Sequence, residues 1–345
     1  MAFVRRGRTT LALVALSFAL LAAPVLAADQ ALIDAAKKEG VATWYTTLII
    51  NQFTRPAAEA FEKKYGIKVE YIRADPNEIA LRISNEAKAG KVLADIFDGF
   101  GMPALVRAGF VEKWIPDTAK RLPQQFWDPN HYWAAPNLFA LTPGYNTDLV
   151  KKGTEPKTFE DLLDPKWKGK LAWNIQPSIS AGQGFAGSVL IAMGEAKART
   201  YLAALAKQNI TPLKVSGRQV LDLVISGEYP IGLQIFNNHA LISSAKGAPV
   251  DWIAMQPPLV TYSVMSVLKD APEPNAGKLL VDYIVSEEGQ KIFADAGELP
   301  VRPNVKPRDP AMIPDGVAFK GTFLTPEQLN RDLPAWSRLF DEYFK

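Results

Sequence analysis

The chain has 345 residues, with 39 basic and 36 acidic side chains, two histidines and no cysteine. Without cysteine it can hold no disulfide framework and no lipidated amino-terminal cysteine. The small net charge of +3 gives no basic field that would favour nucleic acid or an anionic membrane as a partner.

The first 27 residues have the pattern of a cleaved secretory signal. Three arginines among the first eight residues precede an apolar stretch over residues 11–26, and short apolar residues stand before Ala28. Ser17 and Pro24 interrupt the stretch, so a membrane anchor is the weaker interpretation. Loss of the three arginines would leave a neutral mature chain. We expect a periplasmic protein that is not a lipoprotein, and the choice between the general and twin-arginine export routes stays open.

Strands and helices alternate over the first third of the predicted mature chain. The sequence predicts strands at 41–45, 67–72 and 94–99, and helices at 56–65, 77–89 and 103–108. Gly66 and Gly90 follow two of the helices, as carboxyl-terminal glycines commonly do. Strands separated by helices predict a parallel sheet, with a ligand site beyond the carboxyl ends of its strands.

A second series of the same kind follows a tryptophan-, asparagine- and proline-rich stretch. It has predicted strands at 170–174, 211–215 and 230–236, helices at 183–206 and 217–226, and further helices near 275–295 and 325–344. Extended segments at 134–141 and 259–268 would cross between the two series. Two crossings between two α/β lobes predict a hinged clamshell.

The expected domain boundaries follow from these crossings. Lobe 1 would comprise residues 28–136 and 263–305, and lobe 2 residues 140–258 and 306–345. The hinge would lie near 136–142 and 258–264. The proline- and glycine-punctuated corner at 161–172, followed by a small-residue loop that opens a helix, is a further indication of a cleft between two lobes.

Several short segments, taken together in their order, carry a family resemblance. They are Trp44-Tyr45-Thr46-Thr47, Ala94-Asp95-Ile96-Phe97, Tyr145-Asn146-Thr147-Asp148, Asp164-Pro165-Lys166-Trp167-Lys168-Gly169, Gly227-Glu228-Tyr229-Pro230-Ile231-Gly232, Ser286-Glu287-Glu288-Gly289-Gln290 and Pro300-Val301-Arg302-Pro303. The chain resembles the extracellular solute-binding proteins of ABC importers, in the branch that includes ferric-binding periplasmic proteins. The resemblance implies an α/β, two-lobed periplasmic-binding-protein clamshell of type II. Such a protein, expected here as a monomer, delivers a solute to an inner-membrane permease and its ATPase.

The chain departs from the ferric-binding pattern at one position that matters. Ferric-binding members carry two adjacent tyrosines where the second lobe faces the cleft, and here the stretch reads Asn237-Asn238-His239-Ala240-Leu241. No two tyrosines are adjacent anywhere in the chain. We therefore expect no metal site and no cofactor, although Fe³⁺ held by other ligands or by an accompanying anion stays open.

Two helix starts in the predicted second lobe are candidate anion sites. Ser180, Ala181, Gly182 and Gln183 open the first, where free N–H groups carry partial positive charge. A serine-capped helix with no ligand explains the same residues. Arg218 opens the next helix, where a cation opposes the helix dipole and an external anion would compensate it. A solvated arginine or a surface ion pair is the alternative.

Other candidate ligand contacts are polar residues at predicted strand ends or helix starts. They are Thr46, Thr47, Glu78, Asp98, Asn237, Asn238 and Tyr262. Each has a structural alternative, such as a strand-end threonine, a turn aspartate, a helix-start glutamate or a core tyrosine. Asn237 and Asn238 are expected at the end of the strand at 230–236.

The predicted ligand is a small organic, phosphorylated or phosphonate anion, with polyamines or other amine-containing solutes as a second possibility. No Gly-x-Ser-x-Gly, phosphate-loop or His-Glu-x-x-His motif occurs, and His131 and His239 are the only histidines. We therefore expect no enzyme activity. A secreted hydrolase built on two carboxylates is the remote alternative.

Overall fold

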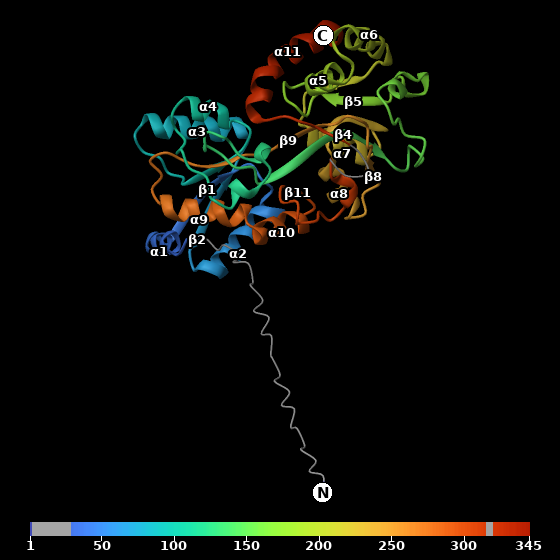
Figure 1. Cartoon of the computed structure of the whole chain (residues 1–345). Helices are drawn as coiled ribbons and strands as arrows, with labels where there is room; N and C mark the ends of the chain where they lie inside the picture. Colours follow the sequence, from blue (N-terminus) through green and yellow to red (C-terminus); the bar gives the residue numbers. More distant parts are fainter. Residues whose placement is uncertain (2–28, 315–319) are drawn as a thin grey trace.

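Two β-sheets and their covering helices build the protein (Figure 1). The computed structural model describes Met1, residues 29–314 and residues 320–345. The predicted signal segment lies outside the described residues, apart from Met1. Within the described ranges, no helix is both long enough and apolar enough to cross a membrane.

The first sheet has four strands in the order β10-β3-β1-β2. Its strands are β1 (Val41–Thr46), β2 (Lys68–Arg73), β3 (Ile96–Asp98) and β10 (Met265–Val267). Its helices are α1 (Gln30–Glu39), α2 (Arg55–Tyr65), α3 (Pro76–Lys88), α4 (Met102–Arg107), α9 (Pro274–Val285) and α10 (Glu287–Asp295). The β1–β2 and β1–β3 pairs are parallel and β10 is antiparallel to β3.

Side-chain alternation along β1 creates two cores, one on each face of this sheet. Trp44 packs with Phe61 and Leu279 among α1, α2 and α9. Tyr45, the next residue, packs with Ile79 and other side chains of α3 and α4 on the opposite face. The result is a three-layer α/β/α lobe whose parallel strands end at one edge.

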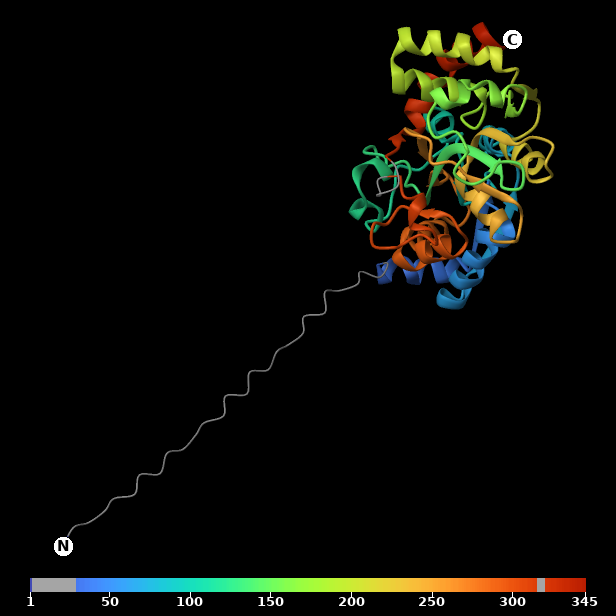
Figure 2. The ribbon, with the colours of Figure 1, turned by 90° about the vertical axis from the view of Figure 1, so that its right-hand side faces the viewer.

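The second sheet has the order β12-β9-β4-β7-β5-β6, with β8 and β11 also paired to β4. Its strands are β4 (Asn137–Asn146), β5 (Leu171–Asn174), β6 (Thr211–Leu213), β7 (Ile231–Phe236), β8 (Val250–Trp252), β9 (Leu259–Tyr262), β11 (Leu299–Pro300) and β12 (Thr322–Phe323). Its helices are α5 (Gly182–Met193), α6 (Glu195–Leu205), α7 (Gly217–Ile225), α8 (Asn237–Ser244) and α11 (Pro326–Phe344). Figure 2 shows α5, α6 and α11 gathered at one end of the molecule, opposite α1 and α2.

A backbone irregularity in β7 gives the second sheet its two packed faces. Ile231 and Leu233 pack toward α5, α6 and α11, whereas Ile235 packs toward α7. Gln234 between them has φ 57°, in the left-handed region that side chains other than glycine rarely adopt. Its amide donates to the carbonyl of Ile179 at 3.2 Å. The last residue of the strand, Phe236, packs against the cluster that contains Ile179 and Trp336 of α11.

Three connections join the sheets. The chain enters the second sheet through β4, returns to the first sheet between β9 and β10, and reaches the second sheet again from α10 through β11. The first two connections, the crossings, agree with the extended segments predicted at 134–141 and 259–268. The two-lobed α/β clamshell fold is thus present, while the predicted domain boundaries and hinge residues remain a prediction.

Two expectations about individual elements are wrong. The helix predicted at 183–206 is broken into α5 and α6 at Gly194, which has φ 73° and starts a new helix. Asn237 and Asn238 do not end a strand, because they form the first turn of α8.

A glycine at the α5–α11 contact offers a test of this packing. A Cβ built on Gly187 would lie 2.3 Å from the indole of Trp336, which is buried. We expect Gly187→Ala to lower the free energy of unfolding by about 1–3 kcal/mol, despite the higher helix propensity of alanine. Urea denaturation followed by circular dichroism would measure the change. Ile191→Ala on the exposed side of α5 is the control, and an equal effect of both variants would contradict the packing.

Candidate ligand-binding site

A cavity of about 780 Å³ lies between the two sheets and is lined from both. This volume suits a small organic molecule. Its lining residues are Thr47, Leu48, Ile49, Ile50, Asn51, Gln52, Arg73, Ala74, Asp75, Pro76, Phe100, Phe139, Arg218, Phe236, His239, Ile242, Ser243, Lys246, Ser263 and Glu298. The first-sheet contributions follow the carboxyl ends of β1, β2 and β3, where ligands of parallel sheets bind.

A buried carboxylate fixes the lining loop that follows β1. Asp98, which is fully buried, accepts from Trp44 Nε1 at 2.7 Å and from the Thr47 backbone N–H and Oγ1 at 3.0 and 2.8 Å. Burial raises the pKa of Asp98, and these donors oppose the rise. Thr46 Oγ1 accepts from the backbone N–H of Leu48 at 3.0 Å. Thr46 and Asp98 therefore position Thr47 and Leu48, which line the cavity.

Aromatic rings form a row along the cavity. The ring centroids of Phe100 and Phe139 are 6.0 Å apart, and those of Phe139 and Phe236 are 5.0 Å apart. His239 continues the row at 5.5 Å from Phe236. Phe100 follows the first sheet and Phe236 ends β7 in the second, so the row gives both halves of the cavity an apolar wall.

Cationic side chains reach the cavity from both sheets. Arg73 ends β2 and donates to the Leu48 carbonyl at 3.0 Å. Arg218 on α7 pairs with Asp222 at 2.8 Å and donates to Ser243 Oγ on α8 at 3.0 Å. Lys246 follows α8 and is exposed.

The ionisation of His239 leaves this charge pattern unchanged near neutral pH. The surrounding protein and the positive charge of Arg218 lower the pKa of His239 to about 4. His239 is therefore neutral, and the cavity's positive charge comes from the arginines and the lysine.

Glu298 places a carboxyl group against the cavity close to the crossings. It stands between α10 and β11, is 6% exposed, and its Oε2 accepts from Asn238 Nδ2 at 2.8 Å and from Asn137 Nδ2 at 3.2 Å. Burial raises the pKa of Glu298 to about 7, against the opposing effect of the two amides. Gly297, at φ 82°, follows the end of α10, and a Cβ built on it would lie 3.1 Å from Ile242 on α8. The carboxyl group is thus held between β4 and α8.

Polar atoms without partners gather around the two crossings. Within the described residues, these buried atoms without hydrogen bonds include Asn137 Oδ1, Thr142 Oγ1, both amide atoms of Asn237, Asn238 Oδ1, Thr261 Oγ1, Tyr262 Oη and Ser263 Oγ. Buried polar atoms are normally paired. These atoms can accept or donate further hydrogen bonds. They lie next to the cavity, because Ser263 is one of its lining residues.

The structure brings some of the predicted site residues to the cavity and leaves others away from it. Thr47 and Arg218 line the cavity. Asn238 does not line it but contacts Glu298, which is a lining residue. Asn237 is fully buried beside them on α8. Arg218 also makes the helix-surface ion pair that was the alternative interpretation.

The remaining candidates lie outside the lining. Glu78 is exposed in the first turn of α3. Tyr262 packs in the first-sheet core, 5.8 Å from both Phe126 and Trp133 between ring centroids. Ser180 lies next to Gly217 at the start of α7, where a Cβ built on Gly217 would lie 3.3 Å from Ser180.

The helix start at 181–183 packs beneath α11. A Cβ built on Gly182 would lie 2.1 Å from the ring of Phe340. Gln183 Nε2 donates to the Ile175 carbonyl at 3.2 Å. Ala181, Gly182 and Gln183 are buried, and in this conformation their side of the helix start faces Phe340.

Sequence reasoning missed several lining residues, above all Glu298, Arg73, Lys246, Phe139 and Ser263. Glu298 stands between the two C-terminal segments that carried the family resemblance, but nothing in its neighbours marks it as a cavity residue. The signal for Phe139 and Ser263 was available, because both lie in the segments predicted to cross between the lobes.

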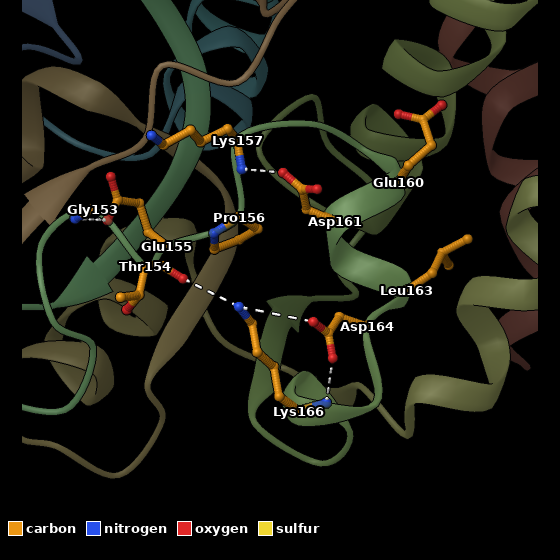
Figure 3. Close-up of a pocket in the computed structure, with 10 residues that line it drawn as sticks. All are labelled: Gly153, Thr154, Glu155, Pro156, Lys157, Glu160, Asp161, Leu163, Asp164 and Lys166. Carbon is orange, nitrogen blue, oxygen red and sulfur yellow. Dashed lines mark hydrogen bonds and ion pairs between the residues drawn. The ribbon is translucent and has the colours of Figure 1, made fainter.

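A second cavity, of about 540 Å³, lies at the proline–glycine corner and shares no lining residue with the first. Hydrogen bonds and an ion pair within this corner engage Asp161, Asp164 and Lys166 (Figure 3). The backbone N–H of Lys157 donates to Asp161 at 2.8 Å, and Lys166 donates to the Thr154 carbonyl at 3.4 Å and lies 3.8 Å from Asp164 Oδ2. The corner at 161–172 contributes no lining residue to the cavity between the sheets.

The metal-binding capacity of the first cavity is small. No tyrosine is among its lining residues. Over the described ranges, no group of three or more histidine, aspartate or glutamate side chains is arranged to hold a metal ion.

Comparison with known proteins gives this cavity its context. The family model of the bacterial extracellular solute-binding proteins matches residues 56–321. The chain belongs to this family. Its members are binding proteins that work with an ABC permease and ATPase.

Relatives of this solute-binding protein include proteins named for different solutes. A periplasmic protein of Salmonella typhimurium named for 2-aminoethylphosphonate binding is 27% identical over 270 residues, covering 75% of this chain and 77% of that one. The major ferric iron-binding protein of Neisseria meningitidis serogroup B is 26% identical over 313 residues, which cover 84% of this chain and 87% of that protein. The structure of iron-bound HitA from Pseudomonas aeruginosa matches with a TM-score of 0.71 at 24% identity. The match covers 87% of this chain and 99% of that one, which shows a shared fold.

The raised pKa of Glu298 predicts a pH-dependent cost to folding. Between its usual value of 4.5 and about 7, the folded protein holds a proton that the unfolded chain has released, so stability falls as the pH rises. We expect the free energy of unfolding of Glu298→Gln, relative to that of the wild type, to rise by up to about 3 kcal/mol between pH 4 and pH 8. One pKa unit corresponds to about 1.4 kcal/mol. Urea denaturation at both pH values measures this, and a pH-independent difference would contradict it.

Proposed function

We propose that this protein is the periplasmic solute-binding component of an ABC importer and that it captures a small organic anion, with phosphonates and phosphate esters as the favoured class. The observation that carries the proposal is the cavity between the sheets, with cationic side chains on both sides and an aromatic row along it. Family membership supports the transport role.

The cationic groups support an anionic solute. Arg73 approaches from the first sheet, and Arg218 and Lys246 approach from the second. The bonds of Arg218 to Asp222 and Ser243 hold its guanidinium in place, which lowers the entropy lost when it binds an oxyanion. A solute touched from both sheets would favour the closed arrangement of the lobes, which is the form we expect the permease to recognise.

The aromatic row supports a solute with a carbon skeleton. Phe100, Phe139 and Phe236 give the cavity an apolar wall that inorganic phosphate alone would leave exposed. The Salmonella typhimurium relative named for 2-aminoethylphosphonate binding is consistent with such a solute.

Ferric iron is the weaker candidate, although several relatives are named for it. Hard, charged phenolate ligands are absent from the lining. Asp75 accepts from the Asn77 N–H at 2.9 Å as the cap of α3, and the Glu298 carboxyl group has a pKa near 7. The histidine and these two carboxyl groups would have to bind Fe³⁺ without tyrosine.

Arg218→Ala tests the anion site. Loss of charge-assisted hydrogen bonds worth about 1.5–3 kcal/mol should weaken binding of ethylphosphonate or 2-aminoethylphosphonate by roughly 10- to 100-fold. Isothermal titration calorimetry of the mature protein would measure it. Arg331→Ala is the matched control, because Arg331 also pairs with an aspartate, Asp332, but lies outside the cavity lining. Equal affinities of wild type and Arg218→Ala would refute the role of Arg218.

Iron binding can be tested separately. We expect mature protein that has been incubated with ferric citrate and desalted to retain substoichiometric iron by elemental analysis, because the cavity lacks phenolate ligands. One equivalent of retained iron, lost in Glu298→Gln or in His239→Ala, would instead establish a ferric site without tyrosine.

A further inference from the structure

Among the described residues, Glu298 is the one carboxyl group of the cavity lining that is almost fully buried. Its exposed fraction is 6%, whereas Asp75, the other carboxylate of the lining, is exposed. Keeping a carboxylate away from water is costly unless a cation compensates it. The protein therefore bears an electrostatic cost at this position that anion binding does not explain.

The part of the chain that the structure describes supplies no cation to Glu298. Within the described ranges, Glu298 forms no ion pair with a lysine, arginine or histidine, and its hydrogen-bond donors are the neutral amides of Asn137 and Asn238. Both amides bond to Oε2. Oε1 receives no hydrogen bond from the described part of the chain and is left for a partner in the cavity.

The surroundings of Glu298 are rich in acceptors. The amide bonds to the carboxylate orient Asn137 and Asn238, so that their Oδ1 atoms point elsewhere and remain without donors. Ser263 Oγ, from the crossing between β9 and β10, is also without a partner and lines the cavity. A group with several N–H donors and a positive charge would match a carboxylate among unpaired oxygens.

We propose that Glu298 forms a cation subsite, so that the solute carries an ammonium group as well as the anionic group that Arg218 and Lys246 attract. This inference rests on the proposed function and narrows its solute class to zwitterions, such as aminoalkylphosphonates. Cationic and anionic subsites at different places in one cavity, with Phe139 and Phe236 along it, fit a short carbon chain between two opposite charges.

The alternative role of Glu298 is that of a neutral acid. With a pKa of about 7, its protonated form could donate a hydrogen bond to an oxygen of the solute. Glutamine keeps a donor and nearly the same shape but cannot carry the negative charge. The Glu298→Gln variant therefore separates the two roles.

The test compares 2-aminoethylphosphonate with ethylphosphonate, which lacks the amine, by isothermal titration calorimetry of the full mature chain. We expect the wild type to prefer the amino compound by at least about 10-fold, as for a charge-assisted contact. Glu298→Gln should lose this preference and keep its affinity for ethylphosphonate. Glu155→Gln, which alters a carboxylate in the other cavity, should behave as the wild type.

A second readout follows the proton. An ammonium beside Glu298 would stabilise the carboxylate, so binding the amino compound at pH 7 should release more protons than binding ethylphosphonate. Titrations in buffers of different ionisation enthalpy measure this difference, which should vanish in Glu298→Gln. A merely structural Glu298 would leave proton release equal for the two compounds.

The outcomes distinguish the inference from the proposed function. Equal wild-type affinities for the two compounds, or a preference that survives in Glu298→Gln, would overturn the cation subsite and leave the anion site standing. Binding of propylamine but not of ethylphosphonate, if it depends on Glu298, would support the subsite and refute the proposed anion class. Absence of binding by all three compounds would contradict both.

Discussion

The hydrogen bonds that Glu298 accepts from Asn137 and Asn238 join three parts of the chain at the cavity. Asn137 begins the crossing strand β4, Asn238 lies in the first turn of α8, and Glu298 precedes β11, which itself pairs with β4. These segments carry or adjoin Phe139, Phe236 and His239 of the lining. The same contact that places a carboxyl group in the cavity therefore fixes the aromatic row and the start of α8.

The cavity is built at a cost to stability. A carboxyl group with a pKa near 7, a left-handed Gln234 two residues before Phe236, and unpaired oxygens along β4 and β9 all lie around the crossings. By contrast, Asp98 is fully buried but receives three hydrogen bonds from Trp44 and Thr47. The carboxylate that positions the loop after β1 is fully paired, while polar groups at the crossings keep capacity for a solute or water.

The sequence predicted the architecture well because it depends on local patterns. Alternating strands and helices, with glycines after the helices, indicated the parallel sheet, and the two extended segments indicated the crossings between sheets. The helix break at Gly194 escaped because the apolar pattern continues across it. Asn237 and Asn238 were assigned to a strand because α8 follows β7 without an intervening turn.

The site was predicted only in part because the cavity unites residues that are distant in the sequence. Thr47 and Arg218 could be found from their places after a strand and at a helix start. Arg73 and Glu298 could not, since only the folded chain brings them to one cavity with the other lining residues. The loop at 180–183 was expected to hold an anion because it opens a helix. Its helix start lies against Phe340 of the C-terminal helix, a contact that no local pattern reveals.

A crystal structure of the mature protein grown with 2-aminoethylphosphonate tests the central claim most directly. We predict density for the compound in the cavity between the sheets, with its phosphonate at Arg218 and its amine at Glu298. An undisturbed cavity with the compound elsewhere, or a metal ion held at His239 and Glu298 in its place, would contradict this account.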